Sequence, residues 1–213
     1  MSKMIAGVRI PDSALAKEVE ELVCDTESEL LFHHSNRVFL FGALAGQRQD
    51  LEVDLELLYI GAMFHDMGLR APYATADERF EVDGANAAAG FMRAHGIDER
   101  AVEDVWDAIA LHTTPGIPRH KRPVVALVTA GVEMDVLGIA YDAFTPEQRH
   151  EVCACHPRGP GFKNGIINAF ACGTFRKPAT TFGNVKADVL ALRDPTYQRV
   201  SFTDMILNSS WPE

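Results

Sequence analysis

Apolar residues recur with the period of a helix along nearly the whole chain. In the segment 51–66 the apolar positions fall at i, i+4, i+7 and i+11, at Leu51, Leu55, Leu58 and Ala62. This spacing places them on one face of a helix. Leu57, Ile60 and Phe64 widen that face, which predicts a largely buried helix. The helix is expected to stop near Met67-Gly68, with Pro72 beyond it, as helices commonly do.

The same periodicity predicts helices over 13–23, 27–45, 85–95, 98–112 and 123–138. A capping box with proline at the first helical position, Thr145-Pro146-Glu147-Gln148, starts another. Two or three more are expected within 162–210, after a loop at 156–165. No segment alternates with period two for long. The sequence therefore predicts an all-α fold, a single domain over 1–213 with a core at about 27–140 and a C-terminal helical extension at about 141–213.

Composition and charge narrow the function classes. With 47% hydrophobic and 23% charged residues in 213, the chain has the composition of a folded globular protein. The net charge is −10 and no long basic run exists, which argues against binding nucleic acid or an anionic membrane surface. Four cysteines are too few for a disulfide scaffold. No signal peptide or membrane-spanning segment is expected, so the predicted location is the cytoplasm.

Histidine and aspartate residues in the predicted helices carry the candidate chemistry. His65 and Asp66 are adjacent at the end of an apolar helix, and burying both costs several kcal/mol unless a partner satisfies them. His34 lies on a separate predicted helix, and Asp135 interrupts the apolar run 124–138. Two His and two Asp suit one divalent transition metal, with Zn²⁺ preferred over Fe²⁺ or Mn²⁺. Such an ion lowers the pKa of bound water and makes a nucleophile at neutral pH.

The order H…HD…D resembles the HD superfamily of metal-dependent hydrolases. The residues around it are similar to the cyanamide hydratase-like branch, most clearly over 34–39, 57–68, 79–84, 108–113 and 134–138 and more weakly over 170–181. The resemblance implies an all-helical HD fold with one bound metal and addition of water across a nitrile. It also implies a ligand set of His34, His65, Asp66 and Asp135.

The resemblance also suggests roles around the metal. Asp66 is expected to orient or deprotonate the water, and His112 to carry a proton to the developing anion. Glu81 is placed near the reacting centre, where it could orient a histidine. Thr113 and Lys177 are the candidate contacts to a small-molecule substrate.

Several plainer interpretations stay open. His33 competes with His34 as the first ligand, Asp83 is more often an N-cap, and Glu81 could simply charge the first turn of a helix. Lys177 could be a solvated lysine. The spacing in Cys153-Ala154-Cys155-His156 is wrong for haem attachment.

The function itself has two alternatives to a hydratase. One is an HD-type phosphohydrolase of a nucleotide or phosphate ester, which would need a cation facing the metal, from Lys177, Arg70 or Arg79. The other is a binding or scaffold protein without turnover. A homo-oligomer is compatible with the apolar C-terminal helices.

Overall fold

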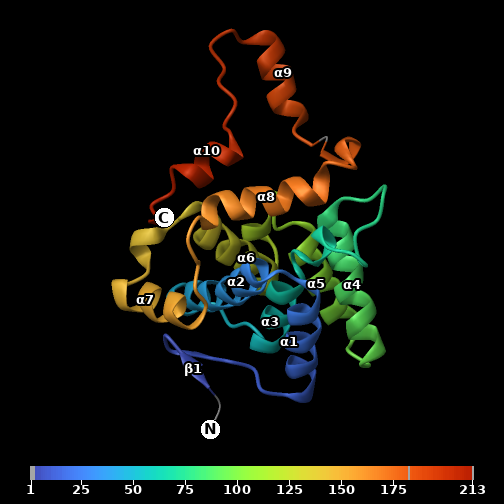
Figure 1. The fold of residues 1–213 in the computed structure, drawn as a ribbon, viewed down its shortest axis with the longest axis vertical. Coiled ribbons are helices and arrows are strands. Elements are labelled where there is room, and N and C mark those ends of the chain that lie inside the picture. Colours follow the sequence, from blue (N-terminus) through green and yellow to red (C-terminus); the bar gives the residue numbers. More distant parts are fainter. Residues whose placement is uncertain (1–2, 182, 213) are drawn as a thin grey trace.

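The computed structural model describes residues 3–181 and 183–212, and their regular secondary structure is almost entirely helical (Figure 1). The described residues form ten α-helices: α1 (Ala14–Thr26), α2 (Glu29–Arg48), α3 (Leu55–Phe64), α4 (Phe80–Ala94), α5 (Glu99–Ala110), α6 (Pro123–Val132), α7 (Pro146–Cys155), α8 (Phe162–Thr174), α9 (Val185–Arg193) and α10 (Phe202–Leu207). A two-residue hairpin, β1 (Met4–Ile5) with β2 (Val8–Arg9), is the one sheet among them. The predicted all-α fold is confirmed.

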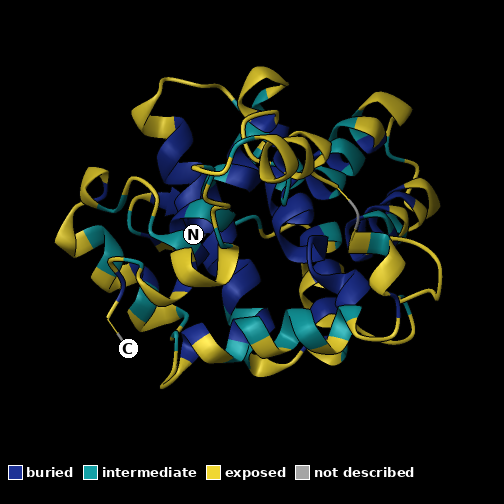
Figure 2. Cartoon of the chain, turned by 90° about the horizontal axis from the view of Figure 1, so that it is seen from above, coloured by how far each residue is buried: buried dark blue, intermediate teal, exposed yellow. Residues whose placement is uncertain are grey.

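Helix α2 forms the centre of the molecule. Every residue from His34 to Gly46 is buried, because α1, α3, α6, α7 and α8 all pack against it. The buried helices lie inside a shell of half-buried and exposed segments (Figure 2). A helix covered on all sides holds its side chains in fixed positions, which suits a precise site.

Glycines allow α2 and α6 to cross in backbone contact. A Cβ on Gly42 of α2 would lie 2.6 Å from the carbonyl oxygen of Leu127, and a Cβ on Gly131 of α6 would collide with the carbonyl of Val38. The two helices can approach this closely only because both positions lack a side chain. This crossing carries α6 toward His34, so it sets the distance between two parts of the candidate site.

Two boundaries differ from the prediction. Helix α4 begins at Phe80 rather than at 85. Gly84 therefore lies inside the helix, where it allows close packing. A Cβ there would be 2.9 Å from the carbonyl oxygen of Phe64. The predicted helix 123–138 changes at Val132 into a π-helical turn, Glu133–Leu137. Such wider turns are frequent at functional sites, and this one buries Met134, Asp135 and Val136 in succession.

The C-terminal helices cover one end of the bundle. Helix α8 lies across it (Figure 1) and joins a small apolar cluster of Leu31, Leu69, Phe80, Val136, Phe162, Ile166 and Ile206. The predicted loop 156–165 is shorter than expected, since α8 already starts at Phe162. The chain end returns to the body through Trp211, which is buried and donates to the carbonyl of Met134 at 2.8 Å.

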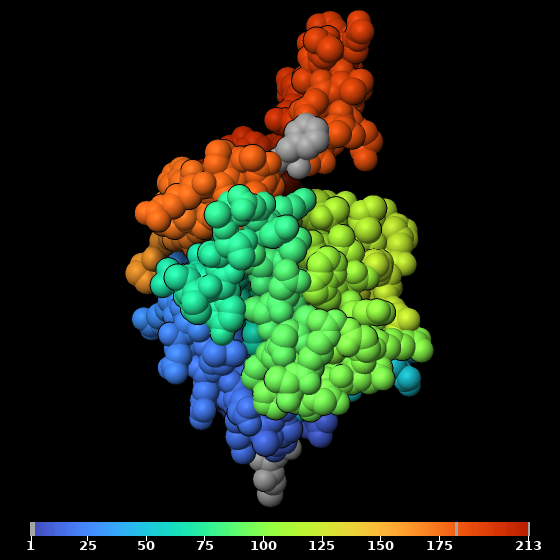
Figure 3. Space-filling view, turned by 90° about the vertical axis from the view of Figure 1, so that its right-hand side faces the viewer, coloured from blue at the N-terminus to red at the C-terminus, as the bar shows by residue number. Residues whose placement is uncertain are grey.

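Between α8 and Trp211 the chain makes an excursion that rises above the rest of the molecule, above the yellow-green region of the body (Figure 3). Several large apolar side chains on it are exposed, including Val189, Leu192 and Val200. The homo-oligomer stays a prediction. Across the described residues, the helices lack the length and continuous apolarity that crossing a membrane requires.

The α2–α6 crossing predicts the effect of a single methyl group. Gly131→Ala should lower the free energy of unfolding by about 1–3 kcal/mol, because the Cβ forces two backbones apart. Gly90→Ala is the matched control, since Gly90 lies in helix α4 and a Cβ there meets nothing within 4 Å. It should raise stability by up to about 1 kcal/mol. Urea denaturation measures both, and equal effects would contradict the close crossing.

Candidate metal centre

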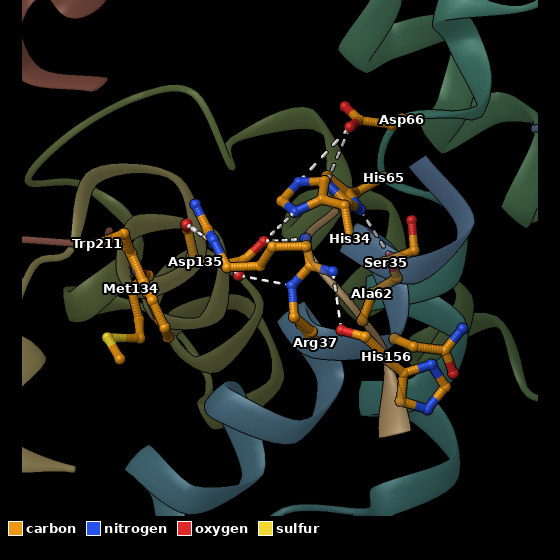
Figure 4. A network of polar contacts seen from close by, with 12 residues as sticks. His34, Ser35, Arg37, Ala62, His65, Asp66, Met134, Asp135, His156 and Trp211 are labelled. Carbon is orange, nitrogen blue, oxygen red and sulfur yellow. Dashed lines mark hydrogen bonds and ion pairs between the residues drawn. The ribbon is translucent and has the colours of Figure 1, made fainter. Parts of the chain in front are cut away.

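Three predicted ligands come together in the core. His34 lies on α2, while His65 and Asp66 follow the last residue of α3. The Nε2 atoms of the two histidines are 3.2 Å apart, and Asp66 Oδ2 lies 3.3 Å from His65 Nε2 and 3.7 Å from His34 Nε2 (Figure 4). In the described chain these are the side chains that group closely enough to hold an ion. The competing His33 lies outside the group.

The Nδ1 atoms of three histidines point away from this centre. His65 Nδ1 lies 2.7 Å from the carbonyl oxygen of Ala62, and His112 Nδ1 lies 2.6 Å from that of Ile109. His34 Nδ1 lies 2.7 Å from Asp135 Oδ2. Because a carbonyl or carboxylate oxygen accepts, each Nδ1 carries the proton. In the neutral form of each ring, Nε2 therefore presents a lone pair toward Asp66, as histidine ligands do when a neighbour fixes their tautomer.

The donor atoms fit a divalent metal. Metal–ligand bonds of about 2.0–2.1 Å in tetrahedral geometry place two ligand atoms about 3.3 Å apart. The observed separations of 3.2, 3.3 and 3.7 Å match that value. Both oxygens of Asp66 and Nε2 of His112 are buried without a hydrogen-bond partner. Buried polar atoms are rarely left unpaired, so these orphaned atoms agree with a cation at this position.

Asp135, the fourth predicted ligand, lies behind His34. Its carboxylate accepts from Arg37, with Nε–Oδ1 at 2.8 Å and Nη2–Oδ2 at 2.9 Å. Arg158 Nη1 adds bonds of 2.6 Å to Oδ1 and to the backbone oxygen of Asp135. The second oxygen also receives His34 Nδ1. In this arrangement the carboxylate orients a ligand, and its role as a ligand itself stays a prediction.

Opposing charges set the protonation of the cluster. Burial disfavours the charged form of Asp135, but Arg37 and Arg158 outweigh it and hold the pKa of that carboxyl well below its usual range. Burial of Asp66 is likewise outweighed, mainly by His65, so the pKa of Asp66 is lowered. Burial lowers the pKa of His34. Burial alone would lower the pKa of His65, but the charge of Asp66 outweighs it and raises that pKa. A bound cation would therefore displace a proton from His65.

His112 connects the cluster to a cavity. Its Nε2 lies 3.9 Å from Asp66 Oδ1. Burial, followed by the charge of His65, lowers the pKa of His112 to about 4, so its imidazole is neutral at physiological pH. His112 also lines a cavity of about 590 Å³ together with Glu81 and Thr113. The candidate catalytic and substrate residues thus meet on one side of the cluster.

Glu81 is a fixed carboxylate in the first turn of α4. It accepts from Arg79 Nη2 at 2.8 Å and from the Thr113 hydroxyl. Burial disfavours its charge, but these two hydrogen bonds outweigh it and lower the pKa of Glu81. Glu81 therefore acts as an acceptor near His112 and not as an acid.

The candidate cations have other partners. Lys177 is buried and its Nζ lies 2.8 Å from Asp83 Oδ2, and it is not among the residues that line the cavity. Its burial rules out the solvated alternative. Asp83 is not an N-cap, because it lies inside the first turn of α4. Arg70 is exposed and donates to the carbonyl of Thr26.

Two buried charged residues near the site, Arg37 and Glu27, were not predicted from the sequence. Arg37 is fully buried and also donates from Nη1 to the carbonyls of His156 and Pro157. Glu27 is buried at the end of α1, where Ser35 donates to its Oε2 and its Oε1 has no partner. Arg37 could have been noticed in the sequence, because it is a charged residue within an apolar stretch of α2. Glu27 carries no such signal, because it sits among acidic residues in the sequence.

Comparison with known proteins decides the family. Residues 31–143, more than half of the chain, match the HD domain. The chain belongs to the HD domain family. The match contains His34, His65, Asp66, His112 and Asp135, and ends before α7. No curated protein matches the chain. HD domains are metal-dependent hydrolases that bind divalent metals, which agrees with the His-His-Asp group described above.

Removing Arg37 should destabilise the HD domain. Arg37→Met leaves the buried Asp135 carboxylate with Arg158 and His34 alone, and losing one partner of a buried ion pair costs about 3–5 kcal/mol. Arg122→Met is the control, because its pair with Asp104 is partly solvated, and such pairs contribute about 0–1 kcal/mol. Urea denaturation compares them. A similar small loss for both would show that Asp135 does not depend on Arg37.

Glu27 predicts a pH dependence of stability. Burial, then the charge of Asp66, raises the pKa of Glu27 from 4.5 to about 8. Between these values the folded chain keeps a proton that the unfolded chain has lost, so stability falls as pH rises through this window. Glu27→Gln should flatten that part of the curve in chelator-treated protein, whereas the exposed Glu103→Gln should not. Denaturation at a series of pH values tests this, and an unchanged slope in Glu27→Gln would contradict it.

Proposed function

We propose that this HD domain protein is a metal-dependent enzyme that uses metal-activated water on an uncharged small molecule, with chemistry like that of a cyanamide hydratase. The observation that carries the proposal is the set of orphaned polar atoms, Asp66 Oδ1 and Oδ2 with His112 Nε2, beside the His34–His65 pair. A binding or scaffold protein has no need for such atoms in its core, because each costs free energy when unpaired.

The chain's residues would divide the work between holding the ion and moving a proton. His34, His65 and Asp66 would hold one divalent ion, with Zn²⁺ favoured by the nitrogen-rich donor set. When bound, the ion supplies Lewis acidity and water that is nucleophilic at neutral pH. Asp135 and Arg37 keep His34 oriented through Nδ1. Thr113 and Glu81 form the polar rim at which a substrate would be placed.

Proton transfer would pass through Asp66 and His112. An oxygen of Asp66 that does not bind the ion can orient or accept a proton from the attacking water. His112 is neutral with its Nε2 lone pair 3.9 Å from Asp66 Oδ1, so it can take that proton and return it to the developing anion on the substrate. The Ile109 carbonyl keeps the ring in the tautomer that this step needs.

The phosphohydrolase alternative lacks a supporting contact. It needs a cation free to bind a phosphate near the ion. Of the three candidates, Lys177 is paired with Asp83, Arg79 is paired with Glu81, and Arg70 is exposed on the surface. These contacts favour an uncharged substrate.

Metal content tests the ligands. The purified protein should carry about one zinc or iron per chain by elemental analysis, because a buried group of two histidines and an aspartate suits one such ion. His65→Ala and Asp66→Ala should lose it. Asp135→Asn should weaken metal affinity by about 10–100-fold, the usual effect of a residue that orients a ligand. His150→Ala, exposed on α7, is the control. Full metal content in His65→Ala would refute the site.

Activity tests the reaction. The metal-loaded protein should release urea from cyanamide and should not release phosphate from nucleotides. His112→Ala should keep its metal and lose most of its rate, about 10²–10⁴-fold for the loss of a proton-transfer group. Phosphate release without urea formation would contradict the hydratase proposal and indicate a phosphohydrolase.

A further inference from the structure

The cavity beside His112 is larger than the smallest hydratase substrate requires. Its volume is about 590 Å³, which lies in the range of about 300–1,000 Å³ typical of sites for drug-sized molecules. A molecule as small as cyanamide would fill a minor part of it. The remaining space has to be occupied either by water or by a further part of the substrate.

The walls of this cavity favour an apolar occupant. Aromatic and aliphatic side chains from α4, the π-helical turn, α8 and α10 line it: Phe80, Val136, Leu137, Phe170, Phe202 and Met205. Phe170 packs edge-on against Phe80, with ring centroids 5.2 Å apart, and lies 5.8 Å from the ring of Phe202. Water gains few hydrogen bonds between such walls, so apolar surface binds there favourably.

The charges on the cavity disfavour an anion. Two carboxylates, Glu81 and Glu133, line it together with one guanidinium, that of Arg79. Arg79 already forms an ion pair with Glu81 at 2.8 Å. The lining therefore has an excess of one negative charge. Among the lining side chains, a phosphate or carboxylate group would therefore find Glu133 but no unpaired cationic group.

The C-terminal excursion completes the cavity. Thr180, Thr181, Asn184 and Val200 belong to the segment that rises above the body and also line the cavity. His112 lines the same cavity, and its Nε2 lies 3.9 Å from Asp66 Oδ1. The cavity thus connects His112, beside the metal cluster, with the C-terminal segment, and a single molecule can contact both.

We propose that the substrate is an uncharged organic molecule with an aryl or branched alkyl body, which binds among Phe80, Phe170 and Phe202 while its reactive end reaches His112. This inference rests on the proposed function for the identity of the reacting end, but the binding of the apolar body does not depend on turnover. The cavity then favours substrates with an apolar aryl or alkyl group and disfavours substrates with an anionic group.

Binding of three probes tests this directly. Benzonitrile has an aryl body and no charge, benzyl phosphate has the same ring with an anionic group, and cyanamide has no body. Affinities are measured by ligand-observed NMR on the full chain, with and without chelator. Benzonitrile should bind at least about tenfold more tightly than cyanamide, since about 1.4 kcal/mol of apolar burial gives that factor. It should also bind more tightly than benzyl phosphate, because the lining offers the phosphate no unpaired cationic side chain. Equal or tighter binding of benzyl phosphate would overturn the proposal.

Variants locate the binding in the cavity. Phe170→Ala should weaken benzonitrile binding about tenfold, whereas Phe175→Ala should not change it, because Phe175 follows the same helix but is 77% exposed and does not line the cavity. Phe202→Ala is a second wall variant at a half-exposed position, which keeps the test valid if Phe170→Ala misfolds. Unchanged affinity in a folded wall variant would overturn the proposal.

The charge is tested separately. Glu133→Gln should improve benzyl phosphate binding several-fold and leave benzonitrile unchanged, and Glu103→Gln on α5 should alter neither. No gain for the phosphate would remove the electrostatic part of the proposal. Benzonitrile binding in the cavity without hydratase activity would refute the proposed function and support this inference, so the two failures can be told apart.

Discussion

The carboxylate of Asp135 is the interaction on which the arrangement of this HD domain depends. It joins α2 through His34 and Arg37, the π-helical turn that carries it, and the segment before α8 through Arg158. All of these groups are largely or fully withdrawn from water. A buried carboxylate with too few partners is costly, so the three segments are held in the one arrangement that satisfies it. His34 takes its orientation from that arrangement.

The cluster itself was predictable because it obeys local rules. An imidazole and a carboxylate in an otherwise apolar helix need a partner, and the end of α3 allows His65 and Asp66 to converge, since the backbone leaves the helix there. The helix that carries His34 was predicted from its apolar periodicity, and His34 itself was assigned from the resemblance to HD proteins. The position of Asp135 behind His34 was not, because it depends on Arg158, which comes from a loop 23 residues later in the chain. Periodicity contains no information about such a contact.

The remainder of the site depends on packing between distant segments. Gly42, Gly84 and Gly131 each permit a close backbone approach inside a helix, and helical periodicity does not predict such an approach. The cavity arises where α4, the π-helical turn and the C-terminal segment meet. The sequence predicts helices in these regions, but it predicts neither the π-helical turn nor the meeting of the three segments. Lys177 shows the same limit: it was expected at the substrate, but Asp83 uses its charge to fasten the segment after α8 to α4.

The return of the chain end to the body gives the protein an intrinsic optical reporter. The chain has two tryptophans. Trp211 touches the carbonyl of Met134, one residue before Asp135, and its ring lies 4.4 Å from the Arg158 guanidinium. Trp106 lies on α5 and bonds to Asn86, on α4. Indole emission depends on neighbouring charges and carbonyl dipoles, so the emission of Trp211 registers the state of the Asp135–Arg158 pair, while Trp106 supplies a reference from another part of the same molecule.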